Sequence, residues 1–241
     1  MNLLELFKGT GSVGRVATRL GYTVTSLDID PKTSPDICSD IMSWDYTSLP
    51  KGHFHTIWAS PLCTYYSAIQ RFIKNDQIEL RRQESDQMVQ RVLDIIEYFQ
   101  PVHWFIENPQ SGALKNRAVV QGLPFHDADY CQYGYPYRKR TRFWTNRILQ
   151  LKLCSYNCPH SDPTTKRHLM AIGQTNEKTR TGRAPPDQYC RSVGIKYNLK
   201  QRYSIPESLL EQLLKPRVKL LIQPRNCVVP PCPSFASLAL P

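Results

Sequence analysis

The sequence contains no uninterrupted apolar stretch near the roughly 20 residues that a membrane-spanning helix needs, and its first residues do not form a signal-peptide pattern. It also lacks internal repeats. Its eight cysteines are scattered and do not form the framework of small secreted proteins, which favours thiols or metal ligands in a reducing compartment. We therefore expect a soluble intracellular protein, in the cytoplasm or nucleus, with no membrane partner.

Acidic residues are in short supply, since 20 Asp and Glu stand against 31 Lys and Arg, for a net charge of +11. This excess of positive charge favours a polyanionic partner, with nucleic acid first among the candidates. The 41% hydrophobic and 21% charged residues are otherwise typical of a soluble protein with a buried core. A chain of 241 residues suits one catalytic domain with a small appendage, and we expect it to be a monomer.

In the first half of the chain, short apolar runs alternate with helical patterns, which indicates a doubly wound, mostly parallel α/β sheet. The predicted strands are Asn2–Phe7, Thr23–Asp28, Thr56–Ala59 and Trp104–Glu107, followed by a strand pair at Asp129–Tyr133 and Arg142–Thr145. The predicted helices are Arg15–Leu20, a crossover helix in which Met88, Val92, Ile95, Ile96 and Phe99 recur at helical spacing before Pro101, and Pro206–Leu214.

Changes in composition divide the chain into four expected parts. Residues 1–146 carry the α/β pattern, and residues 147–201 are rich in Cys, His, Lys, Thr and Pro, as a small irregular insert would be. Residues 202–223 contain the C-terminal helix, which we expect to pack back on the first domain. Residues 224–241 form a Pro-rich tail, for which disorder is the default expectation.

A glycine-rich segment follows the first strand and precedes a helix. Phe7, Gly9 and Gly11 lie where a nucleotide-binding loop brings its backbone close to a ligand, although the same glycines could simply make a tight turn. Asp28 ends the next strand, where such folds place an acid on ribose hydroxyls. Asp40 could lie near an adenine amino group with Ile41 beneath the ring, or Asp40 could be a helix cap. Dinucleotide dehydrogenases share this geometry, so these residues do not define the reaction.

Two further residues follow the third and fourth strands at the same sheet edge. Cys63 could be a nucleophile near basic groups or a buried structural cysteine. Glu107 could be an acid working beside it or a surface ion-pair partner. Their positions on adjacent strand ends favour the catalytic interpretation.

In this order the segments resemble the C5-cytosine-specific DNA methyltransferase family, in its compact phage and viral form. The family's Phe-x-Gly-x-Gly motif matches Phe7, Gly9 and Gly11, and its Glu-Asn-Val is similar to the run beginning at Glu107. Its Pro-Cys-x-x-Phe-Ser motif is matched at Cys63, with Leu62 in place of the proline. Its Tyr-Gly-x-Pro block resembles residues 133–136, but the basic Gln-x-Arg-x-Arg motif that follows is out of register, and the usual C-terminal block is not recognisable.

The resemblance implies a Rossmann-like, class I S-adenosylmethionine-dependent methyltransferase whose insert, residues 147–201, takes the place of the target-recognition region. It implies that S-adenosylmethionine binds at Phe7, Gly9, Gly11, Asp28, Asp40 and Ile41. It also implies that Cys63 adds to a cytosine flipped out of DNA and that Glu107 donates a proton to N3 of the base. Lys139 and Arg140, within the basic run 138–142, are the expected substrate contacts, unless this run is a solvated cationic loop.

The insert carries a second set of candidate ligands. Cys154, Cys158, His160 and His168 are of the types that bind zinc, with Cys190 as a possible substitute, and a structural zinc ion would compensate for the insert's lack of apolar residues. A metal-free loop with surface histidines is the alternative.

Two other functions stay open. The same chemistry could act on cytosine in RNA, because relatives of this family can methylate tRNA. Alternatively, Leu62 and the altered basic motif could mark a catalytically inactive module that binds nucleic acid. Enzymes that methylate exocyclic amino groups are matched only in outline, at residues 60–63.

Overall fold

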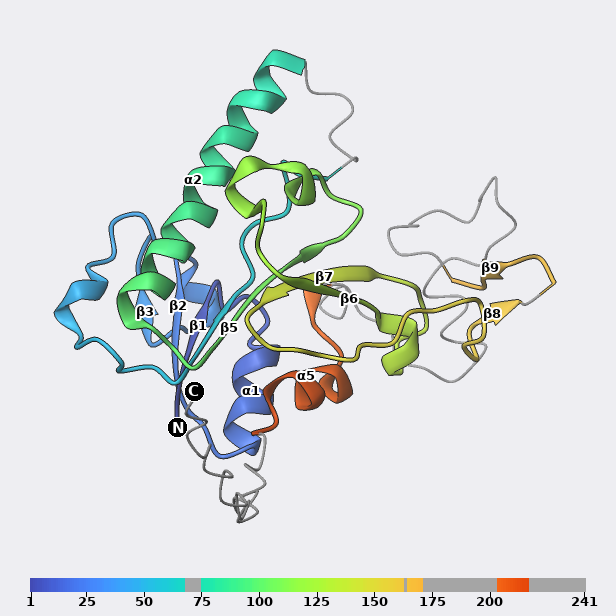
Figure 1. Ribbon diagram of the computed structural model, residues 1–241, viewed down its shortest axis with the longest axis horizontal. Coiled ribbons are helices and arrows are strands. Elements are labelled where there is room, and N and C mark those ends of the chain that lie inside the picture. The colour runs from blue at the N-terminus through green and yellow to red at the C-terminus, as the bar shows by residue number, and fades with distance from the viewer. Residues whose placement is uncertain (68–74, 163, 171–202, 217–241) are drawn as a thin grey trace, which may run out of the picture.

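The computed structural model describes residues 1–67, 75–162, 164–170 and 203–216 (Figure 1). A seven-stranded sheet with the order β3-β2-β1-β4-β5-β7-β6 forms its centre. The strands of this sheet are β1 (Asn2–Leu6), β2 (Thr23–Asp28), β3 (Ile37–Cys38), β4 (Thr56–Ala59), β5 (His103–Pro109), β6 (Phe125–Asp129) and β7 (Arg140–Thr145). Only β7 runs antiparallel to its neighbours, so the sheet is mostly parallel, as expected.

Helices cover both faces of the sheet. The helices are α1 (Ser12–Arg19), α2 (Asn75–Phe99) and α5 (Glu207–Leu214), with short 3-10 helices η1 (Pro31–Thr33), η2 (Tyr46–Ser48), η4 (Ala113–Asn116), η5 (Ala118–Val120) and η6 (Tyr130–Tyr133). Figure 1 shows α1 and α5 side by side on one side of the sheet and α2 on the other. The expected Rossmann-like α/β fold is therefore confirmed.

The two-residue period of the strands separates two cores. In β1, Leu4 and Leu6 face α2 and share a buried cluster with Ile57 of β4. Leu3 points to the opposite face and packs, together with Trp58, against α1 and α5. Because both faces are covered, these strands are apolar almost throughout, as buried parallel strands require.

Two predicted elements need correction. The helix after the glycine loop begins at Ser12, not Arg15, because Gly11 caps it with φ 65° and Gly14 lies inside the helix. The strand predicted at Asp129–Tyr133 is wrong, since β6 ends at Asp129 and the following residues form η6, closed by Gly134 at φ 90°. The pairing of β6 with β7 is marked by charge, not by apolar alternation, because Asp127 and Asp129 lie opposite arginines of β7.

The insert contains a short antiparallel ladder of β8 (Ser161–Asp162) and β9 (Arg167–His168). Most of the remaining insert, with Cys190, and the tail at residues 224–241 lie outside the described residues. The C-terminal helix α5 packs on α1, where Arg19 forms ion pairs with Glu207 and Glu211. Among the residues the structure describes, no helix has the length and apolarity to cross a membrane.

Candidate active site

The strand order reverses direction between β1 and β4, and open α/β sheets bind ligands at the carboxyl ends of the strands at such a point. A cavity of about 560 Å³ lies at this edge. It is lined by residues that follow β1, β2, β3, β4 and β5, including Phe7, Asp28, Asp40, Cys63 and Glu107. One cavity therefore brings together the cofactor-binding and catalytic residues predicted from the sequence, with the exception of Gly11.

The loop after β1 wraps around a carboxylate. The backbone N–H of Gly9 donates to Oδ2 of Asp28 at 2.8 Å, and Phe7 and Gly9 both adopt left-handed backbone conformations, with φ of 61° and 49°. Phe7 and Gly9 line the cavity, as Asp28 does. Gly11 does not line it, and its left-handed conformation instead turns the chain into α1. The loop is thus held on the acid that the sequence assigned to ribose.

Asp40 and Ile41 form the next part of the cavity wall. Oδ1 of Asp40 accepts a hydrogen bond from the backbone N–H of Met42 at 2.9 Å, which is a local turn contact. Ile41 is buried in the core beside α2. The pair therefore presents one carboxyl group and one apolar side chain to the same ligand space.

Glu5 is a cavity residue that the sequence analysis missed. It is only 2% exposed, and its Oε2 accepts a hydrogen bond from the N–H of Gly14 at 3.1 Å. A Cβ atom at Gly14 would lie 2.6 Å from that oxygen, so any larger residue here would force the Glu5 carboxyl group to move. Burial raises the pKa of Glu5 to about 7, although the Gly14 N–H and the charges of Lys8 and Arg15 act in the opposite direction. An acid within an otherwise apolar strand was the signal that could have revealed it.

Cys63 and Glu107 lie on neighbouring strand ends. The side-chain amide of Asn108 donates to the carbonyl oxygen of Pro61 at 3.0 Å, which fastens the Cys63 loop to the end of β5. The hydroxyl of Tyr130 lies 3.5 Å from Oε1 of the nearly buried Glu107 and can donate to it. Contacts from adjacent elements therefore hold the loop that carries Cys63 and the carboxyl group of Glu107.

The thiol of Cys63 has an environment that favours its protonated form. Burial raises the pKa of Cys63, and the negative charge of Glu107 adds to this rise, whereas the positive charge of Lys139 opposes it. Because the thiolate is the nucleophile, burial and the charges of these two neighbours together set how much of it is present.

The loop that carries Cys63 is also tied to α2. The hydroxyl of the buried Tyr66 donates to Oδ1 of Asp86 at 2.8 Å, and Arg117 forms an ion pair with Oδ2 of the same residue at 2.6 Å. Burial, together with this bond, raises the pKa of Tyr66. The sequence analysis missed Asp86 and Arg117, because the distances along the chain give no sign that they meet.

A protein of Frog virus 3 (isolate Goorha), named "Probable DNA (cytosine-5)-methyltransferase", is 30% identical to this chain in an alignment of 233 positions that covers 89% of this chain and 99% of that protein. This chain belongs to the DNA (cytosine-5)-methyltransferase family. The resemblance seen in the sequence is thereby confirmed, whereas the roles of individual residues stay predictions. No protein-family model matches the chain.

The chain is also similar to parts of solved structures. A DNA modification methyltransferase encoded within an E. coli prophage has a TM-score of 0.44 and 19% identity, over 60% of this chain and 46% of that chain. The S. pombe Dnmt2 methyltransferase has a TM-score of 0.43 and 14% identity, over 63% of this chain and 53% of that chain. A Spodoptera frugiperda DNMT2 mutant has a TM-score of 0.42 and 14% identity, over 66% of this chain and 57% of that chain.

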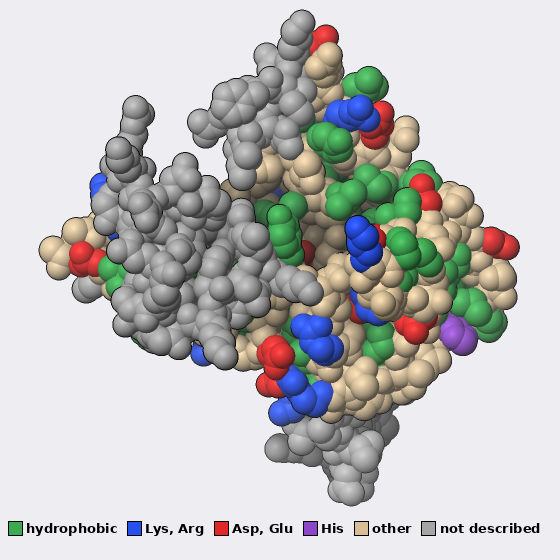
Figure 2. Space-filling view, turned by 180° about the vertical axis from the view of Figure 1, so that it is seen from behind, with side chains coloured by type: hydrophobic (Ala, Val, Ile, Leu, Met, Phe, Trp, Pro, Cys, Tyr) green, Lys and Arg blue, Asp and Glu red, His purple; other side chains and the backbone are tan. Residues whose placement is uncertain are grey.

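The basic run of this DNA (cytosine-5)-methyltransferase family member is partly neutralised by β6. Lys139 lines the cavity, with its amino group 5.0 Å from the centre of the Tyr130 ring. Arg140 does not line the cavity and forms a two-bond ion pair with the buried Asp129, at 3.0 and 2.7 Å. On the face drawn in Figure 2, described Lys and Arg side chains are dispersed among hydrophobic and polar surface. Of the two predicted substrate contacts, Lys139 therefore lies at the cavity, whereas Arg140 is paired with an acid outside it.

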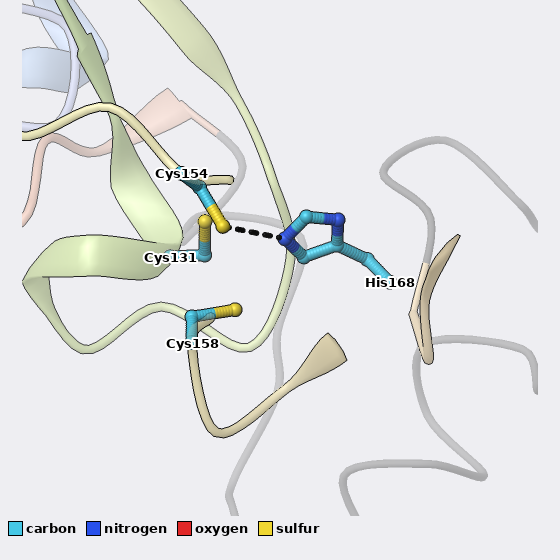
Figure 3. A group of neighbouring side chains, drawn as sticks. All are labelled: Cys131, Cys154, Cys158 and His168. Carbon is cyan, nitrogen blue, oxygen red and sulfur yellow. Dashed lines mark hydrogen bonds between the residues drawn. The ribbon is translucent and has the colours of Figure 1, made fainter. Parts of the chain in front are cut away.

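The ligand set predicted for the insert is changed in one member. Cys154, Cys158 and His168 come together, and the fourth side chain is Cys131 of η6, not His160 (Figure 3). His160 lies outside this group: spacing along the insert favoured a local ligand, whereas the fold brings in Cys131 from η6. The sequence analysis missed Cys131 because 23 residues separate it from Cys154.

Proposed function

We propose that this chain transfers a methyl group from S-adenosylmethionine to C5 of cytosine in DNA. Cys63 is the nucleophile and Glu107 is the proton donor to the base. The observation that carries the proposal is that both side chains line the same cavity as Phe7, Asp28 and Asp40, at the point where the strand order reverses. Membership of the DNA (cytosine-5)-methyltransferase family supports it.

The cavity suits S-adenosylmethionine in size and in side-chain chemistry. Its volume of about 560 Å³ falls within the range of roughly 300–1,000 Å³ for sites of drug-sized ligands. Asp28 and Asp40 offer acceptors for ribose hydroxyls and an amino group, and Phe7 and Ile41 offer apolar walls. When bound, S-adenosylmethionine supplies a methyl group on a positively charged sulfur.

Cys63 begins the reaction by adding its thiolate to C6 of cytosine. A bond forms between Sγ and C6, the electrons of the C5–C6 double bond shift toward N3, and Glu107 gives its proton to N3. C5 is then nucleophilic and would take the methyl group as the bond from that group to the sulfonium sulfur breaks, which would leave the sulfur as a neutral thioether. A solvent water molecule takes the C5 proton, which restores the C5–C6 double bond and expels Cys63 as thiolate, while N3 returns its proton to Glu107.

The charges around Cys63 suit this sequence of steps. Because the charge of Glu107 raises the pKa of Cys63, a Glu107 that carries a proton leaves the thiolate easier to form. Lys139 lowers the same pKa and lies at the cavity, where it can also contact the phosphates of a strand whose base is flipped out. Tyr130 keeps the carboxyl group of Glu107 oriented.

The roles of the remaining segments belong to the same proposal. Residues 1–146 form the catalytic domain, and residues 147–201 act in place of a target-recognition region. Within residues 202–223, α5 completes the catalytic domain by packing on α1. The active unit is a monomer inside the cell, and a structural zinc ion, held outside the reaction cavity, is its second cofactor.

The test is covalent trapping on DNA that carries 5-fluorocytosine, because fluorine cannot leave as the C5 proton does. In the presence of S-adenosylmethionine, the parent protein and a Cys38→Ser control, which alters an exposed cysteine, should form a stable protein–DNA adduct. Cys63→Ser should form none while still binding S-adenosylmethionine.

Full methyl transfer by Cys63→Ser would refute the assignment of the nucleophile. Transfer to tRNA but not to duplex DNA would refute DNA as the substrate. Mass analysis of the modified base distinguishes 5-methylcytosine from a product methylated on the exocyclic nitrogen.

A further inference from the structure

We propose that Cys131, Cys154, Cys158 and His168 bind one Zn²⁺ ion, which fastens the insert to the part of the catalytic sheet that contacts Glu107. The four side chains are buried, and their ligand atoms all lie within 4.8 Å of one another. Figure 3 shows the three cysteine side chains converging from two segments, with the His168 ring facing them from β9. The role at Glu107 rests on the proposed methyl transfer, whereas the metal site does not.

The distances suit a tetrahedral zinc ion. Zn–S bonds of about 2.3 Å and Zn–N bonds of about 2.0 Å place sulfur and nitrogen ligands roughly 3.5 Å apart at a tetrahedral angle. Sγ of Cys154 lies 3.4 Å from Nε2 of His168. The same bond lengths place two sulfur ligands roughly 3.8 Å apart, within the spread of the cluster.

The ligand set points to a structural role. Three cysteines and one histidine fill the four positions that zinc takes in structural sites, which leaves no position for a substrate. The three cysteines of the group form a small buried cluster of their own, separate from the two apolar cores. A short segment with so little apolar packing gains stability from a metal ion.

Neighbouring side chains stabilise the zinc site through hydrogen bonds and by balancing its charge. The backbone N–H of Cys154 donates to Oδ2 of Asp129 at 2.8 Å, and Asp129 also accepts from Arg138 and Arg140. Zinc with three thiolates carries one negative charge, so the two arginines balance that charge together with the charge of Asp129. Partners of this kind orient metal ligands and raise metal affinity.

The site joins two regions far apart in the sequence. Cys131 lies in η6, next to Tyr130, whose hydroxyl contacts Glu107. The N–H of Asp129 donates to the carbonyl oxygen of Lys152, and the N–H of Lys152 donates to the hydroxyl of Tyr133. Zinc would therefore connect the start of the insert to η6, and η6 in turn contacts the carboxyl group of Glu107 through Tyr130.

The test begins with zinc content. Full-length protein purified without chelators should contain about one zinc ion per chain, as should Cys38→Ser and His160→Ala, which change a cysteine and a histidine outside the group. Cys131→Ser should lose the metal. His168→Ala should release zinc to a chelator faster than the parent does. Because a direct ligand is lost, the effect should exceed the about 10–100-fold loss of affinity that follows removal of a residue hydrogen-bonded to a ligand.

Misfolding of a variant is avoided by metal exchange in the parent. Removal of zinc followed by addition of Co²⁺ should give the thiolate-to-cobalt and tetrahedral absorption bands of a site with several sulfur ligands. Metal removal should also increase hydrogen exchange at residues 129–133 and 152–158, while α1 and α2 keep their protection.

Three results would overturn the proposal. They are a protein that lacks zinc and contains a disulfide among the three cysteines, a site that holds iron, and a loss of zinc in His160→Ala that His168→Ala does not share. None of them bears on Cys63, so failure of the metal site and failure of the proposed methyl transfer remain distinguishable.

Discussion

Glu5→Gln should make the protein's stability less dependent on pH between about 4.5 and 7. Burial raises the pKa of Glu5 from 4.5 to about 7, so the folded protein holds a proton that the unfolded chain releases. The stabilisation from Glu5 is complete below pH 4.5 and is lost as the pH rises through 7. A shift of about 2.5 pH units, at about 1.36 kcal/mol per unit, corresponds to about 3 kcal/mol.

Glutamine is a close match for the buried side chain, because its carbonyl oxygen can still accept the hydrogen bond from Gly14. Parent and variant should therefore have similar free energies of unfolding near pH 4.5. At pH 8 the variant should be more stable by about 3 kcal/mol, because the parent must bury a carboxylate.

Urea unfolding at several pH values between 4.5 and 8 measures this difference, since the midpoint and slope give the free energy at each pH. Glu97→Gln is the control, because it removes the same charge from an exposed position on α2. A parent-to-variant difference that does not change with pH, or a control that changes equally, would refute the reasoning.

Four other substitutions test the cavity and the loop that carries Cys63. Glu107→Gln should slow methyl transfer by about 10²–10⁴, yet it should speed alkylation of Cys63 by iodoacetamide near neutral pH, because the charge that raises the thiol pKa is gone. Lys139→Met should slow that alkylation and move its rise with pH to higher values, and equal alkylation rates in all three proteins would contradict both expectations. Asp28→Ala should weaken S-adenosylmethionine binding by about 10- to 100-fold in calorimetric titration, as loss of a charge-assisted hydrogen bond does, whereas unchanged affinity would remove Asp28 from the site. Tyr66→Phe, which deletes the hydroxyl on Asp86, should cost about 1.5–3 kcal/mol of stability in urea unfolding, and an unchanged midpoint would show that this bond adds nothing.

The sequence predicted the central strands well because each is a short run rich in apolar or β-branched residues. β1, β2, β4 and β5 all begin and end within two residues of their predicted bounds. β6 was displaced, because its stability depends on ion pairs between Asp127 or Asp129 and arginines of β7. Such pairs become visible only when the strand partner is known.

The residues of the candidate site also divide into those that the sequence could predict and those that it could not. Cys63 and Glu107 could be found because each directly follows or ends a recognisable strand, and such positions share one sheet edge. Cys131 could not be found, since its partners belong to the insert and no spacing rule joins them. Arg140 shows the opposite limit, because a basic motif does not reveal that a buried acid already holds the arginine.

The packing of α5 on α1 makes folding depend on the order of synthesis. Arg19 and its partner Glu211 are separated by 192 residues, which a ribosome adds in roughly 10–40 s at about 5–20 residues per second. During that time Leu3 and Val16 lack the leucines of α5 that complete their core, whereas α2 has already emerged to cover the other face. A nascent chain stalled before residue 207 should therefore expose one apolar face of its sheet and be a ready target for chaperones.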